Sequence, residues 1–167
     1  MSACGDLTRT ATLAEWRLVA VGKIGSGPES ELFERYNERL RPKISVIEIA
    51  DGKGAAAEIK RREADAILAA VPEGALAVAL DLGPVAPRSE VLAARLSTWI
   101  ETGKPLAFII GGAEGLDARV IKRANHVLSL GPLTWPHMLV RVMLVEQLYR
   151  ARMIATGHPY HRSGRPD

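Results

Sequence analysis

The segment HPYHR, residues 158–162, brings together side chains that can do chemistry on an anionic partner. Arginine can contact a phosphate, tyrosine and histidine can stack on an unpaired base, and histidine can move a proton near neutral pH. A metal site is not expected, because two histidines three residues apart have no cysteine and only Asp167 as a nearby carboxylate. The plainer alternative for this segment is a solvated basic tail.

His137 and Arg141 form a second candidate pair, four residues apart and therefore on one face of a predicted helix. The residues around Arg141 are almost all apolar. An arginine in such a helix is costly unless its charge is paired or functional. The pattern therefore marks Arg141, more than the arginines in polar surroundings, as a residue with a specific role.

Two loops rich in glycine or proline could hold a ligand through their main chain. Gly111 and Gly112 follow an apolar run, and a residue without Cβ lets the backbone approach a ligand closely. Residues 130–137, LGPLTWPH, form a stiff irregular loop that could present backbone groups to a purine while Leu133 or Trp135 packs on its face. The plainer alternatives are a strand-to-helix turn and a helix cap, and the GxGxxG dinucleotide fingerprint is absent.

The elements that must position these residues alternate between short apolar runs and helical patterns. Strands are predicted at 16–21, 44–49, 76–82, 106–110 and 126–130. Helices are predicted at 28–40, 55–70, 89–102 and 117–124, with Ser89 and Asp117 as N-caps. This order predicts an α/β fold, a single-domain, mostly parallel sheet with helices on both faces, and ligands of such sheets bind at the carboxyl ends of the strands.

The last predicted helix, 136–154, is apolar nearly all the way round. A helix of this kind has to be buried on all sides. Two interpretations stay open, a homodimer interface and a helix buried deeply within one chain.

Composition and charge restrict the class of protein. The 167 residues suit one domain, and the single cysteine, Cys4, cannot form an internal disulfide, which favours a reducing compartment such as the cytoplasm. No apolar run approaches the roughly 20 residues needed to span a bilayer. The net charge of +3 belongs entirely to residues 150–167, so residues 1–149 are neutral. A neutral body with a basic end suggests an anionic partner that is met at one place.

Five segments in order carry a resemblance to a known family: WRLVAVGK, VALDLGP, FIIGGAEGL, LTWPHMLVRVMLVEQLYRA and HPYHR. Over residues 16–162 the chain resembles the RlmH family, ribosomal RNA large subunit methyltransferases of the SPOUT (trefoil-knot) superfamily. The resemblance implies a C-terminal trefoil knot, a homodimer, and methylation of N3 of a pseudouridine by S-adenosylmethionine. The implied target is a stem-loop of 23S rRNA in the assembled ribosome.

The resemblance also implies the site residues and the extent of the domain. Cofactor contacts fall on Leu80, Gly111, Gly112, Leu130, Gly131, Pro132, Leu133, Thr134 and Trp135. Catalytic or RNA-facing candidates are His137, Arg141, His158, Tyr160, His161 and Arg162. One domain spans 16–162, between an extension at 1–15 that is expected to be disordered and a short one at 163–167. The chain has Ala113 and Trp135 where the family commonly has a proline and an aliphatic residue.

The chemistry expected of the C-terminal segment is removal of the N3 proton by His158 or His161, with Tyr160 orienting the base and the arginines holding negative charge. Two other functions remain open on the sequence. One is a SPOUT methyltransferase acting on tRNA or on a ribose 2′-OH, and the other is a non-catalytic ribosome-binding module.

Overall fold

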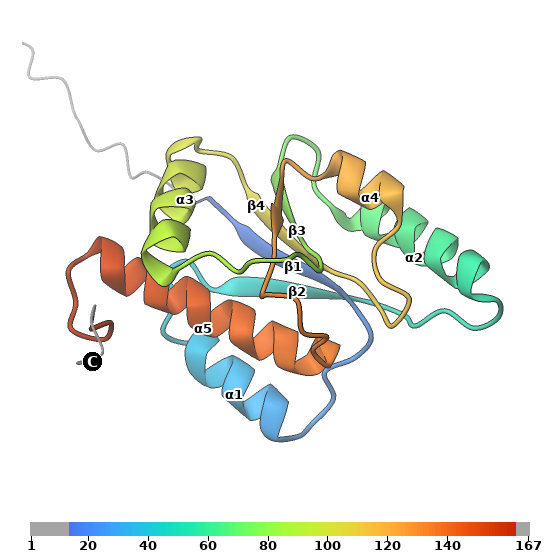
Figure 1. The fold of residues 1–167 in the computed structure, drawn as a ribbon, viewed down its shortest axis with the longest axis horizontal. Coiled ribbons are helices and arrows are strands. Elements are labelled where there is room, and N and C mark those ends of the chain that lie inside the picture. The colour runs from blue at the N-terminus through green and yellow to red at the C-terminus, as the bar shows by residue number, and fades with distance from the viewer. Residues whose placement is uncertain (1–13, 163–167) are drawn as a thin grey trace, which may run out of the picture.

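A computed structural model describes residues 14–162, so nearly all of the two predicted extensions, 1–15 and 163–167, lies outside the described residues. Five parallel strands form one sheet in the order β2-β1-β4-β3-β5 (Figure 1). The strands are β1 (Trp16–Val21), β2 (Ile44–Ile49), β3 (Leu76–Leu80), β4 (Leu106–Ile110) and β5 (His126–Leu128). The helices are α1 (Pro28–Asn37), α2 (Ala56–Ala70), α3 (Ser89–Glu101), α4 (Ala118–Arg123) and α5 (His137–Ala155). The predicted parallel α/β fold is confirmed.

Helices cover both faces of the sheet, with α1, α3 and α5 on one face and α2 and α4 on the other (Figure 1). Side chains of a strand alternate between the two faces. In β1, Leu18 and Ala20 accordingly pack with α1, α3 and α5, whereas Val19 and Val21 pack with α2 and α4. The two central strands β3 and β4 are buried along their whole length, as their continuous apolar runs predict.

The predicted boundaries differ from the observed ones at the end of α1, which stops at Asn37 instead of 40, and at the carboxyl ends of two strands. Strand β3 ends at Leu80 instead of 82 and strand β5 at Leu128 instead of 130, because both strands lead there into the loops at the carboxyl edge of the sheet. Asp117 is the N-cap of α4, and its Oδ1 accepts the N–H of Arg119 at 2.8 Å, as predicted. Ser89 as N-cap was wrong, since Arg88 holds that position and the Ser89 hydroxyl lies 3.4 Å from Gln147 Oε1.

Helix α5 packs between α1 and α3 against the sheet, and only part of its surface is buried within the chain. Leu144, Val145 and Leu148 are completely buried, whereas Leu139 is 38% exposed and Met143 is half-buried. The apolar side chains of Leu139 and Met143, on the outward side of α5, are therefore not fully covered by the described part of their own chain. Among residues 14–162, no helix is both long enough and apolar enough to cross a membrane.

Candidate functional site

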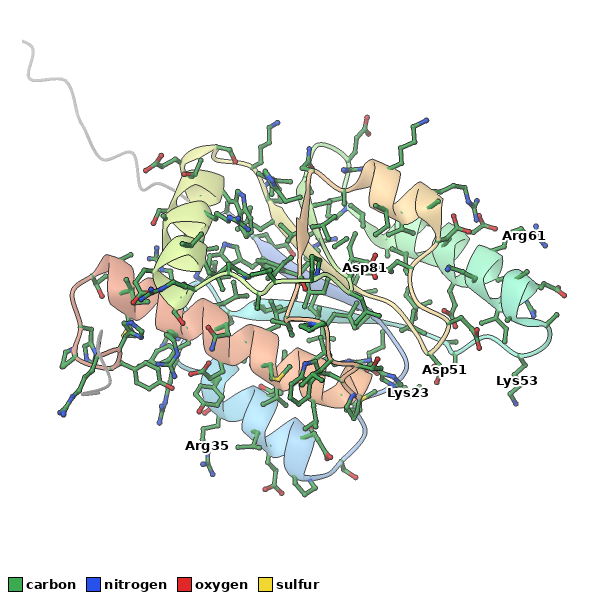
Figure 2. All side chains as sticks on the ribbon, in the orientation of Figure 1. Lys23, Arg35, Asp51, Lys53, Arg61 and Asp81 are labelled. Atoms are coloured by element: carbon green, nitrogen blue, oxygen red, sulfur yellow. The ribbon has the colours of Figure 1, made fainter. Side chains whose placement is uncertain are left out.

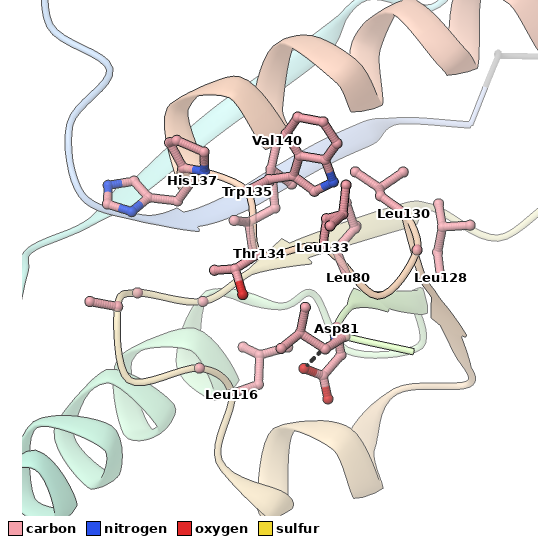
Figure 3. A pocket seen from close by; sticks show the side chains of 18 residues that line it. Leu80, Asp81, Leu116, Leu128, Leu130, Leu133, Thr134, Trp135, His137 and Val140 are labelled. Carbon is pink, nitrogen blue, oxygen red and sulfur yellow. Dashed lines mark hydrogen bonds between the residues drawn. The ribbon is translucent and has the colours of Figure 1, made fainter. Parts of the chain in front are cut away.

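A cavity of about 530 Å³ opens at the carboxyl ends of β3, β4 and β5, beside the start of α5 (Figure 3). Most of the side chains that line it are apolar, and three loops that are far apart in the sequence supply them. The lining residues are Leu80, Asp81, Leu82, Ile110, Gly111, Gly112, Ala113, Gly115, Leu116, Leu128, Leu130, Gly131, Leu133, Thr134, Trp135, Pro136, His137 and Val140. Its size lies within the range of roughly 300–1,000 Å³ that small-molecule sites occupy.

Main chain forms the wall of the cavity at Gly111 and Gly112. A Cβ added at Gly111 would lie 2.9 Å from Leu116 Cδ2, and one added at Gly112 would lie 2.9 Å from Glu63 Oε2 and 3.0 Å from Val21 Cγ1. Neither position has room for a Cβ, because Leu116 of the same loop crowds Gly111, and Glu63 and Val21, which lie outside the lining, crowd Gly112. The backbone therefore faces the cavity without a Cβ between them.

Ser129 fixes the opposite loop. Its Oγ accepts the N–H of Gly131 at 3.0 Å and lies 3.2 Å from the Gly83 carbonyl, so one hydroxyl joins the loops after β3 and β5. Gly131 has φ +100°, a conformation that favours glycine. Asp81, at the same edge, uses Oδ1 to accept the N–H of Leu82 at 2.9 Å.

The structure places eight of the nine predicted cofactor residues around this cavity, and the exception is Pro132, which is exposed outside the lining. Leu116 belongs to the lining although the sequence analysis did not single it out. It is an apolar residue between the glycine loop and the N-cap of α4, and that position was a usable signal. Nothing in the sequence around Ser129 marked it.

His137 lies at the mouth of the cavity, and its ring turns toward the loop after β1 (Figure 3). A Cβ added at Gly22 would lie 3.4 Å from His137 Nε2 and 3.3 Å from Asp51 Oδ1, so both side chains border the Gly22 turn. Lys23 and Asp51 come from the loops after β1 and β2 at this same edge (Figure 2). Of the predicted catalytic residues, His137 alone lines the cavity.

Arg141 is completely buried, so the structure does not place it on an RNA-facing surface. Its Nη1 pairs with Glu48 Oε1 at 3.0 Å, and its Nη2 donates to the carbonyls of Val21 at 2.9 Å and Gly22 at 2.6 Å. Glu48 also accepts the N–H of Ile24 at 2.7 Å, and this bond, followed by the Arg141 partnership, lowers the pKa of the Glu48 carboxyl. The charge of Arg141 is therefore paired inside an apolar helix, although its buried Nε has no hydrogen-bond partner among the described residues. Its Nη2 holds the turn next to His137.

The HPYHR segment lies at the other end of α5 from the cavity (Figure 1). The helix has 19 residues, which at about 1.5 Å per residue corresponds to about 28 Å. None of His158, Tyr160, His161 and Arg162 is among the residues that line the cavity. Within one chain, the structure therefore does not bring the two groups of predicted catalytic residues together.

Tyr160 anchors this segment to its own helix. Its hydroxyl donates to Glu146 Oε1 at 3.1 Å. Its ring meets the Tyr149 ring edge-on, with 4.8 Å between the two ring centroids, and the Arg150 guanidinium carbon lies 4.9 Å from the Tyr160 centroid. Burial, together with the neighbouring phenol and carboxylate, raises the pKa of Tyr160, so its hydroxyl stays protonated. In this arrangement the ring packs on protein.

His161 and His158 differ in their surroundings. His161 Nε2 lies 3.0 Å from Glu90 Oε1, and its buried Nδ1 has no hydrogen-bond partner among the described residues. The pKa of Glu90 is lowered, first by a hydrogen bond from its own main-chain N–H and then by His161. His158 is exposed, and its Nδ1 accepts the N–H of Tyr160 at 3.2 Å. Within residues 14–162, no group of three or more His, Cys, Asp or Glu side chains is placed to hold a metal ion.

Comparison with known proteins identifies the family. The family described as "Predicted SPOUT methyltransferase" matches residues 14–161. The chain belongs to the SPOUT methyltransferase family. Members of this family use S-adenosylmethionine, and membership also implies the C-terminal knot.

Several relatives carry the name ribosomal RNA large subunit methyltransferase H. One from Gluconacetobacter diazotrophicus is 57% identical over 150 residues, which covers 90% of this chain and 99% of that protein. One from Acidiphilium cryptum is 57% identical over 157 residues and covers 94% and 99%. A solved structure of a methylase family protein from Neisseria gonorrhoeae has a TM-score of 0.50 at 9% identity, covers 98% of this chain and 92% of that one, and supports the SPOUT fold alone.

Proposed function

We propose that this protein transfers a methyl group from S-adenosylmethionine to N3 of a pseudouridine in the 23S rRNA of the assembled ribosome, in the cytoplasm. The observation that carries the proposal is the cavity at the carboxyl ends of β3, β4 and β5, whose wall at Gly111 and Gly112 is main chain. It occurs in a chain whose relatives are named for methylation of large-subunit ribosomal RNA.

The residues around the cavity fit this cofactor. An apolar lining with main chain at Gly111 and Gly112, and with Leu133 and Trp135 from the loop before α5, suits a purine, which needs stacking surface and a few fixed hydrogen-bonding groups. When bound, S-adenosylmethionine supplies an electrophilic methyl group on sulfur, so the protein has to contribute alignment and electrostatics. Holding the acceptor nitrogen in line with that methyl group is worth about 7–11 kcal/mol at best.

The chain must also provide for the loss of the N3 proton, because a protonated imide nitrogen has no free lone pair. An imidazole is the side chain suited to accept a proton near neutral pH. His137 is the histidine at the mouth of the cavity, and His158 and His161 belong to the distant segment. Arginine stays charged and instead stabilises an anion or contacts phosphate.

We infer that a second copy of the chain brings the HPYHR segment to the cavity beside His137. Leu139 and Met143 form an apolar row on the outward side of α5, next to a groove of about 500 Å³ that Leu32, Trp135 and Val142 help to line. Two helices packed on each other through this row in antiparallel fashion would place the HPYHR segment of one subunit near the cavity of the other. The proposed active site is then built from both subunits.

Methylation of ribosomes tests the reaction. Purified protein with labelled S-adenosylmethionine should methylate ribosomes from a strain that lacks this gene, and mass spectrometry of their 23S rRNA should show N3-methylpseudouridine. Methylation of tRNA or of a ribose 2′-OH instead would contradict the proposed target. Cofactor binding without methylation of any RNA would support the non-catalytic ribosome-binding module.

Mixing two inactive variants tests the shared site. Gly111→Ala damages the cavity and Arg162→Ala the distant segment, so a heterodimer of the two has one intact site only if the site combines both subunits. Random re-association should then restore about a quarter of wild-type activity, since half of the dimers are mixed and each holds one working site. No recovery, with mixed dimers demonstrated by mass, would contradict the shared site.

A further inference from the structure

We infer that Glu63 is a positioning residue for the cofactor cavity, an inference that rests on the proposed function. Glu63 lies on α2, on the opposite face of the sheet from α5, and does not line the cavity. It is nevertheless 6% exposed, and it forms no ion pair with a described residue. A buried carboxylate without a counter-charge is costly, so its presence calls for a specific explanation.

The contacts of Glu63 join two loops of the ligand edge. Its Oε1 accepts the N–H of Gly52 at 3.1 Å, in the loop after β2. Its Oε2 would lie 2.9 Å from a Cβ at Gly112, in the loop after β4, so the carboxylate rests directly against the backbone that forms the cavity wall. One side chain therefore supports the cavity wall from behind and fixes the neighbouring loop.

A second residue of α2 packs against the loop after β2. Ile59 precedes Glu63 by four residues and lies on the same helical face. A Cβ at Gly52 would lie 2.7 Å from Ile59 Cγ2, so Gly52 also has no room for a side chain. The face of α2 that carries Ile59 and Glu63 presses on Gly52 and Gly112 together, and this contact sets the position of the wall at Gly112.

Substitution of Glu63 should therefore weaken cofactor binding although the residue does not contact the cofactor. With Glu63→Ala, the dissociation constant for S-adenosylmethionine, measured by calorimetry on the full chain, should rise about tenfold. Glu63→Gln keeps the size of the side chain and an oxygen that accepts the Gly52 N–H. It should stay within about threefold of the wild type.

Ile67→Ala is the matched control, because Ile67 is buried on the same face of α2, one turn beyond Glu63. It should lower the melting temperature at least as much as Glu63→Ala but leave the dissociation constant within about threefold of the wild type. If Ile67→Ala weakens cofactor binding as much as Glu63→Ala, the effect is general destabilisation and the inference is wrong. It is also wrong if Glu63→Gln and Glu63→Ala lose equal affinity, or if neither loses any.

Hydrogen exchange gives a readout that does not need the cofactor. In Glu63→Ala the Gly52 amide should exchange faster than in the wild type, whereas in Glu63→Gln it should stay protected. Unchanged exchange in Glu63→Ala would overturn the inference by itself. Failure of the wild type to bind S-adenosylmethionine would instead overturn the proposed function, so the two failures are distinguishable.

Discussion

Replacement of Arg141 by alanine should destabilise the protein strongly, although the sequence made this arginine a catalytic or RNA-facing candidate. The guanidinium donates to two main-chain carbonyls and to Glu48. The substitution leaves the carbonyls of Val21 and Gly22 without this donor inside the protein, at about 1–3 kcal/mol each. Glu48 loses less, because its side chain is 30% exposed and keeps the N–H of Ile24.

Removal of one partner from a buried ion pair typically costs about 3–5 kcal/mol, and the hydrogen bonds of Arg141 place this variant within that range. The total stability of a domain is about 5–15 kcal/mol, so Arg141→Ala should lose a large share of it. For a chain of this length the melting temperature should fall by about 6–20 °C. Arg141→Lys should lose less, because an ammonium keeps the charge and part of the bonding.

Urea unfolding followed by circular dichroism measures this loss, at one fixed protein concentration because dimerisation would add to the apparent stability. Arg152→Ala, on the same helix but half-buried, is the control and should lose no more than about 1 kcal/mol. A loss below about 1 kcal/mol for Arg141→Ala would show that the buried network contributes little to folding. It would refute the structural role given to Arg141.

Three further predictions concern acid stability, the cavity and the dimer. The N–H of Ile24 lowers the pKa of the Glu48 carboxyl below its ordinary 4.5. The stability that ionised Glu48 contributes is therefore present above pH 4.5 and is lost as the pH falls through the lowered pKa. In Glu48→Gln, the urea concentration at the midpoint of unfolding should decrease less with falling pH than in the wild type. Gly111→Ala should weaken cofactor binding, measured by calorimetry, at least about tenfold. Gly27→Ala, whose Cβ would lie 3.4 Å from its nearest neighbour, should leave it unchanged, and equal affinities of the two variants would contradict the close packing at Gly111. Met143→Glu, on the outward row of α5, should convert dimer to monomer in light scattering, and an unchanged mass would place the interface elsewhere.

The fold was predictable because its signals are local. The continuous apolar runs of β3 and β4 mark strands buried on both faces, and the residues between them repeat with helical spacing. The resemblance to the RlmH family implied nine cofactor residues, and eight of them line one cavity, because parallel strands place the loops after them at one edge of the sheet.

The partners of side chains were not predictable, because they lie far apart in the sequence. Arg141 pairs with Glu48, 93 residues away, and no local pattern indicates that choice. In the sequence, Glu63 is one of several charged residues of a helix, and its contact with Gly112 appears only in the structure. The distance between His137 and HPYHR was available from the sequence, because the length of the predicted helix already separates them by many turns.

The glycine wall of the cavity has a consequence for inhibitors. A compound that fills the cavity meets main chain at Gly111 and Gly112, and a point mutation cannot remove a peptide group as it can remove a side chain. A side chain introduced at either glycine to block the compound would collide with Leu116 or Glu63 and disturb the site for its own cofactor. Resistance to a ligand that relies on this wall would therefore have few single-substitution routes that preserve activity.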